Sequence, residues 1–250
     1  MKKILSLVLV LVMALCLFAG CASKEGDTSD KLTMATNAEF PPFEYLENGE
    51  IVGADVEIAQ AIAKKLGKEL EITNIDFDAA LTGAATGKYD MAVAGITAND
   101  DRKKNMNFSV DYYTASQAII VMSDSEIATA ADLTGKTIAC QEGTTGEQYL
   151  MDNNYAIQSF KTGAEAVAAM TSGKVDAVVI DDAVARALSE KQNGATKVLD
   201  EALTKEAYAI AIKKGNDELT KQINKALEEL KADGTLAKIF EKYGLPYDAE

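Results

Sequence analysis

The heptapeptide GKYDMAV at residues 87–93 recurs as GKVDAVV at residues 173–179, and this repeat is a first indication of two similar lobes. Each copy follows a short alanine-rich segment of helical character and leads into an apolar run that is typical of a buried strand. Two copies are too few for a solenoid, in which stacked repeats bury one another. A chance likeness between two helix-to-strand turns is the alternative. We favour two similar α/β lobes, each of which contains one copy.

Helix-like and strand-like segments alternate along the rest of the chain, which favours an α/β fold. Strand-like runs at residues 116–122 and 207–213 flank the second copy of the repeat. They indicate that the second lobe is inserted into the first, so that the chain crosses between the lobes twice. The remaining predicted elements are strands at 31–36, 69–75 and 89–96, helices at 54–67 and 78–87, and two C-terminal helices with apolar stripes (Leu219, Ile223, Leu227, Leu230; Leu236, Ile239, Phe240, Tyr243).

The first 20 residues (1–20) have the pattern of a processing signal. Lys2 and Lys3 precede an apolar run that is short for a membrane span. The run ends in LFAGC, and small residues before a cysteine resemble a bacterial lipobox. We expect cleavage before Cys21 and lipid on its thiol, with ordinary secretion and a spare thiol as the alternative. Residues 21–30 are expected to be a polar tether, followed by lobe 1 at 31–117 plus 209–250 and lobe 2 at 118–208.

Composition excludes several classes of function. The chain has no histidine, which removes Ser-His and Cys-His nucleophile pairs and imidazole metal sites. It carries 39 Asp and Glu against 25 Lys and Arg, and this acidic balance disfavours nucleic-acid binding. Cys140 lies in an apolar run and has no evident disulfide partner, so we expect it to be buried and inert. No metal or cofactor is expected.

Candidate anion-binding residues come directly after predicted strands, where open α/β sheets bind ligands. Thr97 and Asp100 form a helix-start signal, and Arg102 lies near that start. The planar fork of an arginine fits a carboxylate. Thr144 opens a second predicted helix start after another strand, with Thr145 next to it. A solvated surface arginine and plain helix capping are the alternatives at these two places.

Candidate residues for the rest of a ligand come from other strand ends. Asp181 follows the second copy of the repeat and can receive an ammonium group, or it can cap the next helix. Phe40 and Phe77 either pack in the core or flank a ligand. Two facing lobes that offer Arg102 to a carboxylate, Asp181 to an ammonium and aromatic walls between them suit a free α-amino acid.

Many motifs of the chain, in order from residue 31 to residue 244, resemble those of the polar-amino-acid-binding proteins of ABC importers, solute-binding family 3. The resemblance implies a type II periplasmic-binding-protein fold, whose two lobes are joined by two hinge crossovers and close on a ligand. The motifs are ATNAEFPPFEY, IVGADVEIAQAIAKKLG, DFDAAL, GKYDMAVAGITANDDRKKNMNFSVDYY, ADLTGKTIACQEGTTGE, GKVDAVVIDD and DGTLAKIFEKYG.

The resemblance also implies a role for each candidate residue. Arg102 would grip the ligand carboxylate, and the ammonium would meet the carbonyl of Gly95, the hydroxyl of Thr97 and Asp181. Asn37 and Gln141 would meet the distal end of the ligand side chain. Many relatives have Asp where this chain has Asn37, although Glu39 is nearby. The remaining roles are carboxylate assistance by Thr97 and by Thr144 or Thr145, and aromatic walls formed by Phe40 and Phe77.

The family implies a monomeric, extracytoplasmic receptor that hands an amino acid to a membrane permease and is held to the bacterial cell membrane by its lipid. We favour lysine or arginine as the ligand, with a neutral polar amino acid such as glutamine as the alternative. A dehydratase-like enzyme on the same fold is a second alternative, in which Glu142 or Glu147 would act. A signalling sensor is disfavoured because no output domain follows in the sequence.

Overall fold

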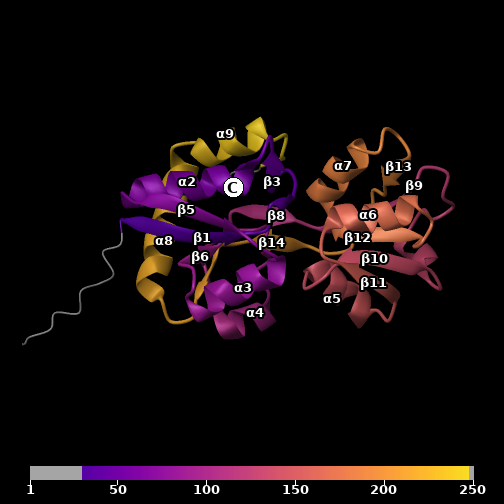
Figure 1. The fold of residues 1–250 in the computed structure, drawn as a ribbon, viewed down its shortest axis with the longest axis horizontal. Helices are drawn as coiled ribbons and strands as arrows, with labels where there is room; N and C mark the ends of the chain where they lie inside the picture. Colours follow the sequence, from indigo (N-terminus) through magenta and orange to yellow (C-terminus); the bar gives the residue numbers. More distant parts are fainter. Residues whose placement is uncertain (1–29, 248–250) are drawn as a thin grey trace, which may run out of the picture. The chain divides into compact units, whose positions relative to one another are not determined.

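The computed structural model describes residues 30–247, which form two α/β lobes, each built on a five-stranded sheet (Figure 1). The two sheets confirm the two-lobed α/β fold that the repeat predicts. The expected signal peptide at residues 1–20, the expected lipid-bearing Cys21 and the tether up to residue 29 lie outside the described residues. The bounds assigned to the lobes from the sequence remain a prediction.

The sheet of the first lobe has three parallel strands in the order β5, β1, β6. It is extended by β15, which runs antiparallel to them, and by β7, which pairs antiparallel with β15. Figure 1 shows α2 on one side of this sheet and α3 on the other. A separate small sheet, β2–β3–β4, follows β1 in the chain. The elements are β1 (Lys31–Thr36), β2 (Glu39–Phe40), β3 (Glu44–Glu47), β4 (Glu50–Val52), α2 (Ala54–Leu66), β5 (Glu69–Asn74), α3 (Phe77–Thr86), β6 (Met91–Ala92), α4 (Asp100–Asn105), β7 (Met106–Phe108), β15 (Ala211–Lys213), α8 (Asp217–Ala232) and α9 (Thr235–Lys242).

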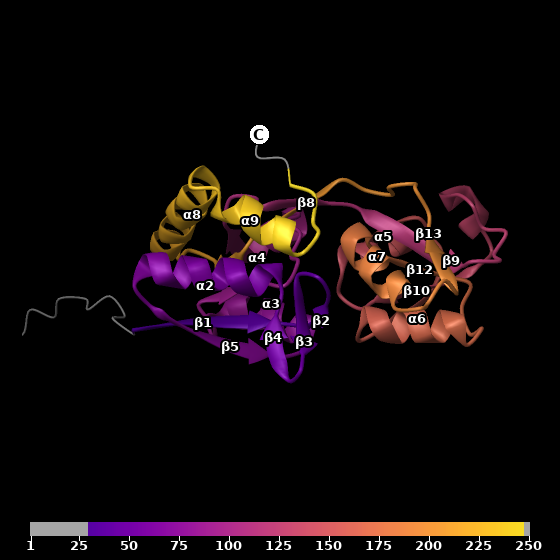
Figure 2. The ribbon, with the colours of Figure 1, turned by 90° about the horizontal axis from the view of Figure 1, so that it is seen from above.

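The sheet of the second lobe repeats this plan in the order β11, β10, β12, β9, β13. The first three strands are parallel, β9 runs antiparallel to them, and β13 pairs antiparallel with β9. Helix α5 packs on one face of the sheet, and α6 and α7 pack on the other (Figure 1). The face that α6 and α7 cover is toward the viewer in Figure 2. The elements are β9 (Gln117–Met122), a 3₁₀ turn at Ala130–Leu133, β10 (Thr137–Gln141), α5 (Thr145–Asp152), β11 (Ala156–Phe160), α6 (Gly163–Thr171), β12 (Ala177–Asp181), α7 (Asp182–Glu190) and β13 (Thr196–Val198).

The two copies of the repeat occupy equivalent positions in the two sheets. Its first copy leads into β6 and its second into β12, and each of these strands is the third in its sheet. The aspartate of each copy accepts the backbone N–H of a threonine near the start of the neighbouring parallel strand. Asp90 accepts from Thr33 at 2.8 Å, and Asp176 accepts from Thr137 at 2.8 Å. The two copies therefore fix the register of equivalent strand pairs in the two lobes.

Two strands connect the lobes. β8 (Tyr113–Ala115) lies between β7 and β9 in the chain, and β14 (Glu206–Tyr208) lies between β13 and β15. The two pair with each other in antiparallel fashion, and Figure 1 shows them between the two sheets. These are the two crossovers expected from an inserted second lobe.

An aromatic cluster anchors this pair of strands to the first lobe. The ring of Phe43 lies 5.0 Å from that of Tyr113 and 5.1 Å from that of Tyr208, centroid to centroid. Phe240 of α9 adds a further contact with Tyr113 at 5.2 Å. Edge-on aromatic contacts of this kind add to the gain from burial alone. The paired strands β8 and β14, which form the hinge, are therefore fixed to the first lobe by packing.

Two predicted strands differ from the structure. The run at residues 89–96 forms a strand only at Met91–Ala92, since the backbone turns at Gly95 with a φ of 54°. The run at residues 207–213 is divided between β14 and β15, because the N–H of Ala209 donates to the carbonyl of Ile96 rather than to a neighbouring strand of one sheet. Both interruptions lie where the chain approaches the space between the lobes.

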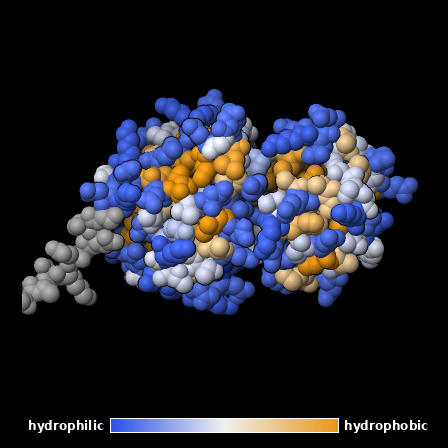
Figure 3. Space-filling view, viewed as in Figure 1, coloured by the Kyte–Doolittle hydropathy of each residue, from blue (hydrophilic) through white to orange (hydrophobic). Residues whose placement is uncertain are grey.

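The chain carries a net charge of −14, and Figure 3 shows hydrophilic residues around much of the outline of the face in view. Hydrophobic residues gather on the upper half of each lobe in this view, and hydrophilic ones lie along the lower part of the line where the lobes meet. Among residues 30–247, no helix combines the length and the apolar character that a membrane span requires. Cys140 is buried, as expected, and its burial raises the pKa of the thiol to about 11.

Candidate functional site

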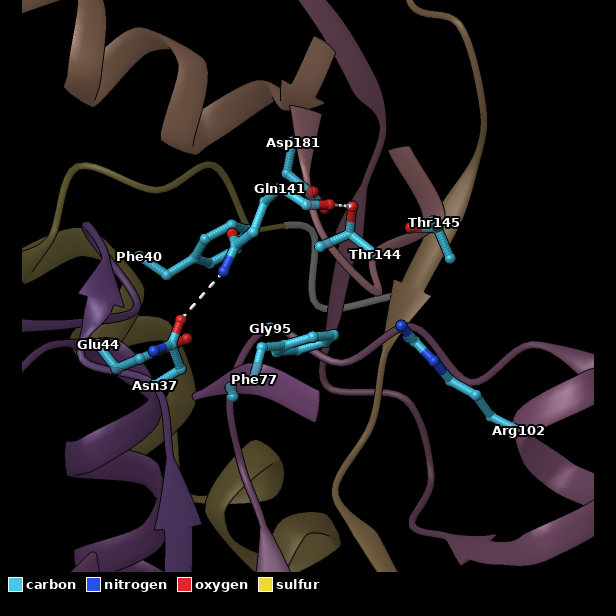
Figure 4. Close-up of a pocket in the computed structure, with 11 residues that line it drawn as sticks. Asn37, Phe40, Glu44, Phe77, Gly95, Arg102, Gln141, Thr144, Thr145 and Asp181 are labelled. Carbon is cyan, nitrogen blue, oxygen red and sulfur yellow. Dashed lines mark hydrogen bonds between the residues drawn. The ribbon is translucent and has the colours of Figure 1, made fainter. Parts of the chain in front are cut away.

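A narrow pocket lies between the two lobes (Figure 4). All the ligand-binding residues predicted from the sequence line it except Thr97, which lies just outside it. The lining also includes Glu44, which the sequence analysis did not select. The residues that line the pocket are Asn37, Phe40, Glu44, Phe77, Ala94, Gly95, Arg102, Gln141, Thr144, Thr145 and Asp181.

Arg102 lies on α4, and its guanidinium points into the pocket (Figure 4). It donates to the carbonyl of Thr97 at 2.9 Å and to the carbonyl of Gly143, in the second lobe, at 3.0 Å. The guanidinium carbon lies 5.4 Å from the centre of the Phe77 ring. Burial lowers the pKa of Arg102, while Asp181 and other nearby carboxylates raise it. The group is a fixed, largely desolvated cation.

The helix start beside Arg102 differs from the prediction. Thr97 and Asp100 were expected to form the start signal, but Asn99 is the N-cap and its side chain accepts the N–H of Arg102 at 2.8 Å. The backbone of Thr97 is instead bridged to Tyr208 of β14, which draws it toward the hinge. The predicted start at Thr144 is confirmed, because its hydroxyl accepts the N–H of Glu147.

Asp181 ends β12 and is buried, with only 4 % of its surface exposed. It accepts a hydrogen bond from Gln117 at 2.8 Å and another from the hydroxyl of Tyr208. Burial and then the charge of Glu206 raise its pKa, the two hydrogen bonds lower it, and the resulting pKa is about 7. No cation pairs with Asp181 among the described residues, so it can receive one.

Phe40 and Phe77 form apolar walls of the pocket, from β2 and from the first turn of α3. Because Gly95 has no side chain, the ring of Phe40 can pack close to the backbone there. A Cβ at this position would lie 2.7 Å from the Phe40 ring, and the backbone φ of 54° also favours glycine. An aliphatic side chain of a ligand can therefore lie between aromatic surfaces.

Asn37 and Gln141 meet across the two lobes. Gln141 Nε2 donates to Asn37 Oδ1 at 3.0 Å, and Asn37 Nδ2 donates to the carbonyl of Ile75 at 3.1 Å (Figure 4). Gln141 Nε2 also donates to the carbonyl of Lys161 at 3.2 Å. The predicted neighbourhood of Asn37 and Gln141 is thus present, with the two amides bonded to each other.

Glu44 is the residue that sequence reasoning missed. It begins β3, has 1 % of its surface exposed, and neither carboxylate oxygen has a hydrogen-bond partner among the described residues. Burial is the main reason why its pKa is well above the ordinary value, and the neighbouring carboxylate of Asp55 raises it further. Such a group calls for a hydrogen-bonded cation or a retained proton.

The register of the hairpin could have identified Glu44. Directly paired residues of antiparallel strands share one face, and Phe40 pairs with Glu44 while Glu39 pairs with Tyr45. If Phe40 lines the pocket, then its paired residue Glu44 must lie on the same face and line the pocket too. Glu39, the carboxylate noted from the sequence, is exposed on the other face.

Asp55 lies behind this part of the pocket on α2 and is fully buried. Its Oδ2 accepts the N–H of Gly95 and the hydroxyl of Tyr112, both at 2.9 Å. Burial raises its pKa to about 6. Asp55 therefore fixes the turn at Gly95 and adds negative charge near Glu44.

The two sides of the pocket carry groups of opposite charge. In Figure 4 the guanidinium of Arg102 and the carboxylate of Glu44 lie on opposite sides of the space between the phenylalanines. Arg102 can hold an anion, while Asp181 and Glu44 can each hold a cation. Within residues 30–247, no group of three acidic or cysteine side chains is placed to hold a metal ion.

Comparison with known proteins places the site in a family. The family model described as bacterial extracellular solute-binding proteins, family 3, matches residues 32–246. The arginine-binding extracellular protein ArtP of Bacillus subtilis is 36% identical over 251 residues, which is 97% of this chain and 98% of ArtP.

Two solved structures of an ancestral arginine-binding protein share 43% of their residues with this chain. The one bound to glutamine superposes with a TM-score of 0.82 and covers 86% of this chain and 97% of that one. The one bound to arginine has a TM-score of 0.81, with coverage of 86% and 98%.

Proposed function

The chain belongs to the bacterial extracellular solute-binding proteins, family 3, and we propose that it captures an L-amino acid with a cationic side chain, arginine in the first place, for delivery to the permease of an ABC importer. Glu44 is the observation that carries the choice of ligand. Its buried carboxylate lies beside the carboxylate of Asp55, accepts no hydrogen bond from the described residues and stands on the side of the pocket away from Arg102, which matches a guanidinium or an ammonium at the end of a ligand side chain.

The backbone groups of the ligand would occupy the other side of the pocket. Arg102 would release its hydrogen bond to Gly143 and grip the ligand carboxylate in a bidentate pair. Asp181 would pair with the α-ammonium, helped by the carbonyl of Gly95. The hydroxyl of Thr97 would approach the same ammonium from just outside the lining.

The side chain of the ligand would lie between Phe40 and Phe77. A flat guanidinium can stack on an aromatic ring and still hydrogen-bond in its own plane. Asn37 and Gln141 would add neutral hydrogen bonds near the distal end, and Thr144 and Thr145 would line the side of the second lobe.

Capture would proceed by closure of the lobes. The ligand bridges Arg102 of the first lobe and Asp181 of the second, so it binds the closed state better and shifts the population toward it. The closed protein would then be the form that the permease recognises. We further propose that the protein is a monomer, is not an enzyme, and is held to the cell membrane by lipid on Cys21.

A thermal-shift and calorimetric screen of the purified chain against the common L-amino acids tests the proposal. Ligand at 100 times its Kd should add about 2.7 kcal/mol to the free energy of unfolding. Arginine or lysine should give the largest shift. The protein should be unfolded, dialysed and refolded first, so that a copurified ligand does not mask the response.

Other results would select the alternatives. A larger shift with glutamine than with arginine would keep the receptor and reject the cationic ligand. No shift with any amino acid after refolding would reject amino-acid capture. Turnover of prephenate or arogenate would favour the dehydratase-like enzyme.

A further inference from the structure

Glu206 links the two lobes through one carboxylate oxygen. It is the first residue of β14, and its Oε2 accepts the hydroxyl of Thr97 at 2.5 Å and the hydroxyl of Thr145 at 2.7 Å. Thr97 follows β6 in the first lobe, whereas Thr145 begins α5 in the second. A single acceptor is therefore shared by both sides of the pocket.

The other oxygen fixes the orientation of the carboxylate. Glu206 Oε1 accepts the hydroxyl of Thr204 at 2.7 Å, and Thr204 Oγ1 accepts the N–H of Gln117 at 2.9 Å. Gln117 is the first residue of β9, next to the other crossover. Both carboxylate oxygens are thus used, and the side chain is oriented by groups of the hinge itself.

Thr97 is tied to β14 by backbone as well. Its backbone is bridged to Tyr208, and the N–H of Ala98 donates to the carbonyl of Ala207 at 3.2 Å. The distance from Glu206 to the first lobe is therefore set independently of any ligand. The bond from Thr145 is the one that depends on how closely the second lobe approaches.

We propose that Glu206 is a positioning residue that holds the closed form together by accepting the hydroxyls of Thr97 and Thr145 at the same time. The proposal rests on capture by closure between the lobes. Glu206 does not line the pocket, so it acts on the closed state and not on the ligand. A change in the stability of the closed state alters the apparent Kd of every ligand by the same factor.

This uniform effect separates Glu206 from the residues that contact ligand. Hydrogen bonds to a charged acceptor are among the stronger ones, and the loss of the Thr145 bond should raise Kd roughly tenfold. The factor should be the same for arginine and for glutamine. The increase should come from faster dissociation, because the bond forms after encounter.

The experiment compares Glu206→Ala and Glu206→Gln with the wild-type chain, by calorimetry and stopped-flow dissociation for both ligands. Glu206→Ala should weaken both ligands by one factor, and Glu206→Gln, which keeps one acceptor oxygen, should weaken them less. The matched control is Glu201→Gln in the same segment. Glu201 accepts the N–H of Ala130 at 2.7 Å within the second lobe, so this change should leave both Kd values unaltered.

A second pair of variants changes Thr145, the other partner of the bond to Glu206. It keeps the proposal testable if the Glu206 variants fold poorly. Thr145→Val removes the hydroxyl with little change of shape and should raise both Kd values. Thr145→Ser, which keeps the hydroxyl, should raise them less. Each single variant also removes bonds of its own, since Thr145 Oγ1 accepts from Gln117 Nε2 at 3.3 Å and Glu206 accepts from Thr97 and Thr204. The double variant Glu206→Ala/Thr145→Val should therefore lose less than the sum of the two single losses, because the bond between Glu206 and Thr145 is lost in both.

Additive losses, unequal factors for the two ligands, or an unchanged Kd in Glu206→Ala would each overturn the proposal. These outcomes are distinct from failure of the proposed function, in which the wild-type chain itself binds neither ligand.

Discussion

Replacement of Glu44 by glutamine should convert a preference for arginine into one for a neutral amino acid. Glutamine has nearly the same shape as glutamate, so the change removes charge and little packing. Glu44 is 1 % exposed, and its oxygens accept no hydrogen bond from the described residues. When protonated, Glu44 can donate to the neighbouring carboxylate of Asp55, and the amide N–H of glutamine can take over that bond. The ligand-free variant should therefore be at least as stable as the wild type, because the cost of burying a carboxylate is removed.

The loss in affinity follows from the bonds that a guanidinium would make to this carboxylate. Hydrogen bonds to charged groups contribute about 1.5–3 kcal/mol each, which corresponds to roughly 10- to 150-fold in Kd for arginine. Glutamine, the ligand, has no charge to pair, so its Kd should change less than about threefold. The ratio of the two Kd values is the quantity to follow, since it cancels any general effect on closure.

Isothermal titration of both ligands into wild type and variant gives this ratio directly. The control is Glu39→Gln on the same hairpin, where the carboxylate is exposed and pairs across the strands with Tyr45, on the opposite face. It should leave both Kd values unchanged. A parallel loss of arginine and glutamine in Glu44→Gln, or undiminished arginine binding, would refute the role of Glu44.

Three further predictions concern the rest of the pocket. Arg102→Ala should weaken every α-amino acid at least tenfold in calorimetry, and near-normal affinity for arginine would contradict its role. Gly143→Ala should weaken all ligands alike, because a Cβ there would lie 1.9 Å from Asp78 Oδ1. Gly173→Ala, with a similar φ of 73° and nothing within 4 Å, should lower Tm but leave Kd unchanged. The pKa of Asp181, raised to about 7 from 3.8, predicts weaker amino-acid binding as pH falls from 8 to 5. Over the same range its contribution to the free energy of unfolding of the ligand-free protein should rise, because the native state takes up a proton that the unfolded chain does not bind. Urea titrations should show a shallower pH slope for Asp181→Asn, and an unchanged slope would contradict the shift.

The fold was predictable because its signals are local and repeated. The apolar spacing and Gly67 define α2, and the structure has that helix at Ala54–Leu66 with Gly67 in a left-handed cap. The two copies of the repeat indicated two lobes. The role of Asp90 and Asp176 in fixing the strand register is visible only in the structure. The interruption at Gly95 escaped prediction because it depends on Asp55, 40 residues earlier in the chain.

The sequence predicted those parts of the site in which a single residue near the end of a strand supplies the charge. Arg102 and Asp181 each follow a strand, and the sheet topology brings them to one pocket. Glu44 and Glu206 were missed because their importance comes from what surrounds them. An unsatisfied buried carboxylate and an acceptor shared by two lobes are properties of tertiary packing, and sequence spacing holds no signal for the second.

The surplus of acid in the pocket explains how one site can prefer a cation and still accept a neutral ligand. The burial that raises the pKa of Glu44 and Asp55 favours a retained proton when no cation is present. A protonated Glu44 can donate to the amide oxygen of a glutamine side chain, whereas the ionised form accepts from a guanidinium. The proton and the cationic side chain thus compete for the same carboxylate. In the proposed receptor, a preference for arginine over glutamine would depend on how readily Glu44 gives up its proton. Its burial opposes that loss most, and the negative charge of Asp55 opposes it further.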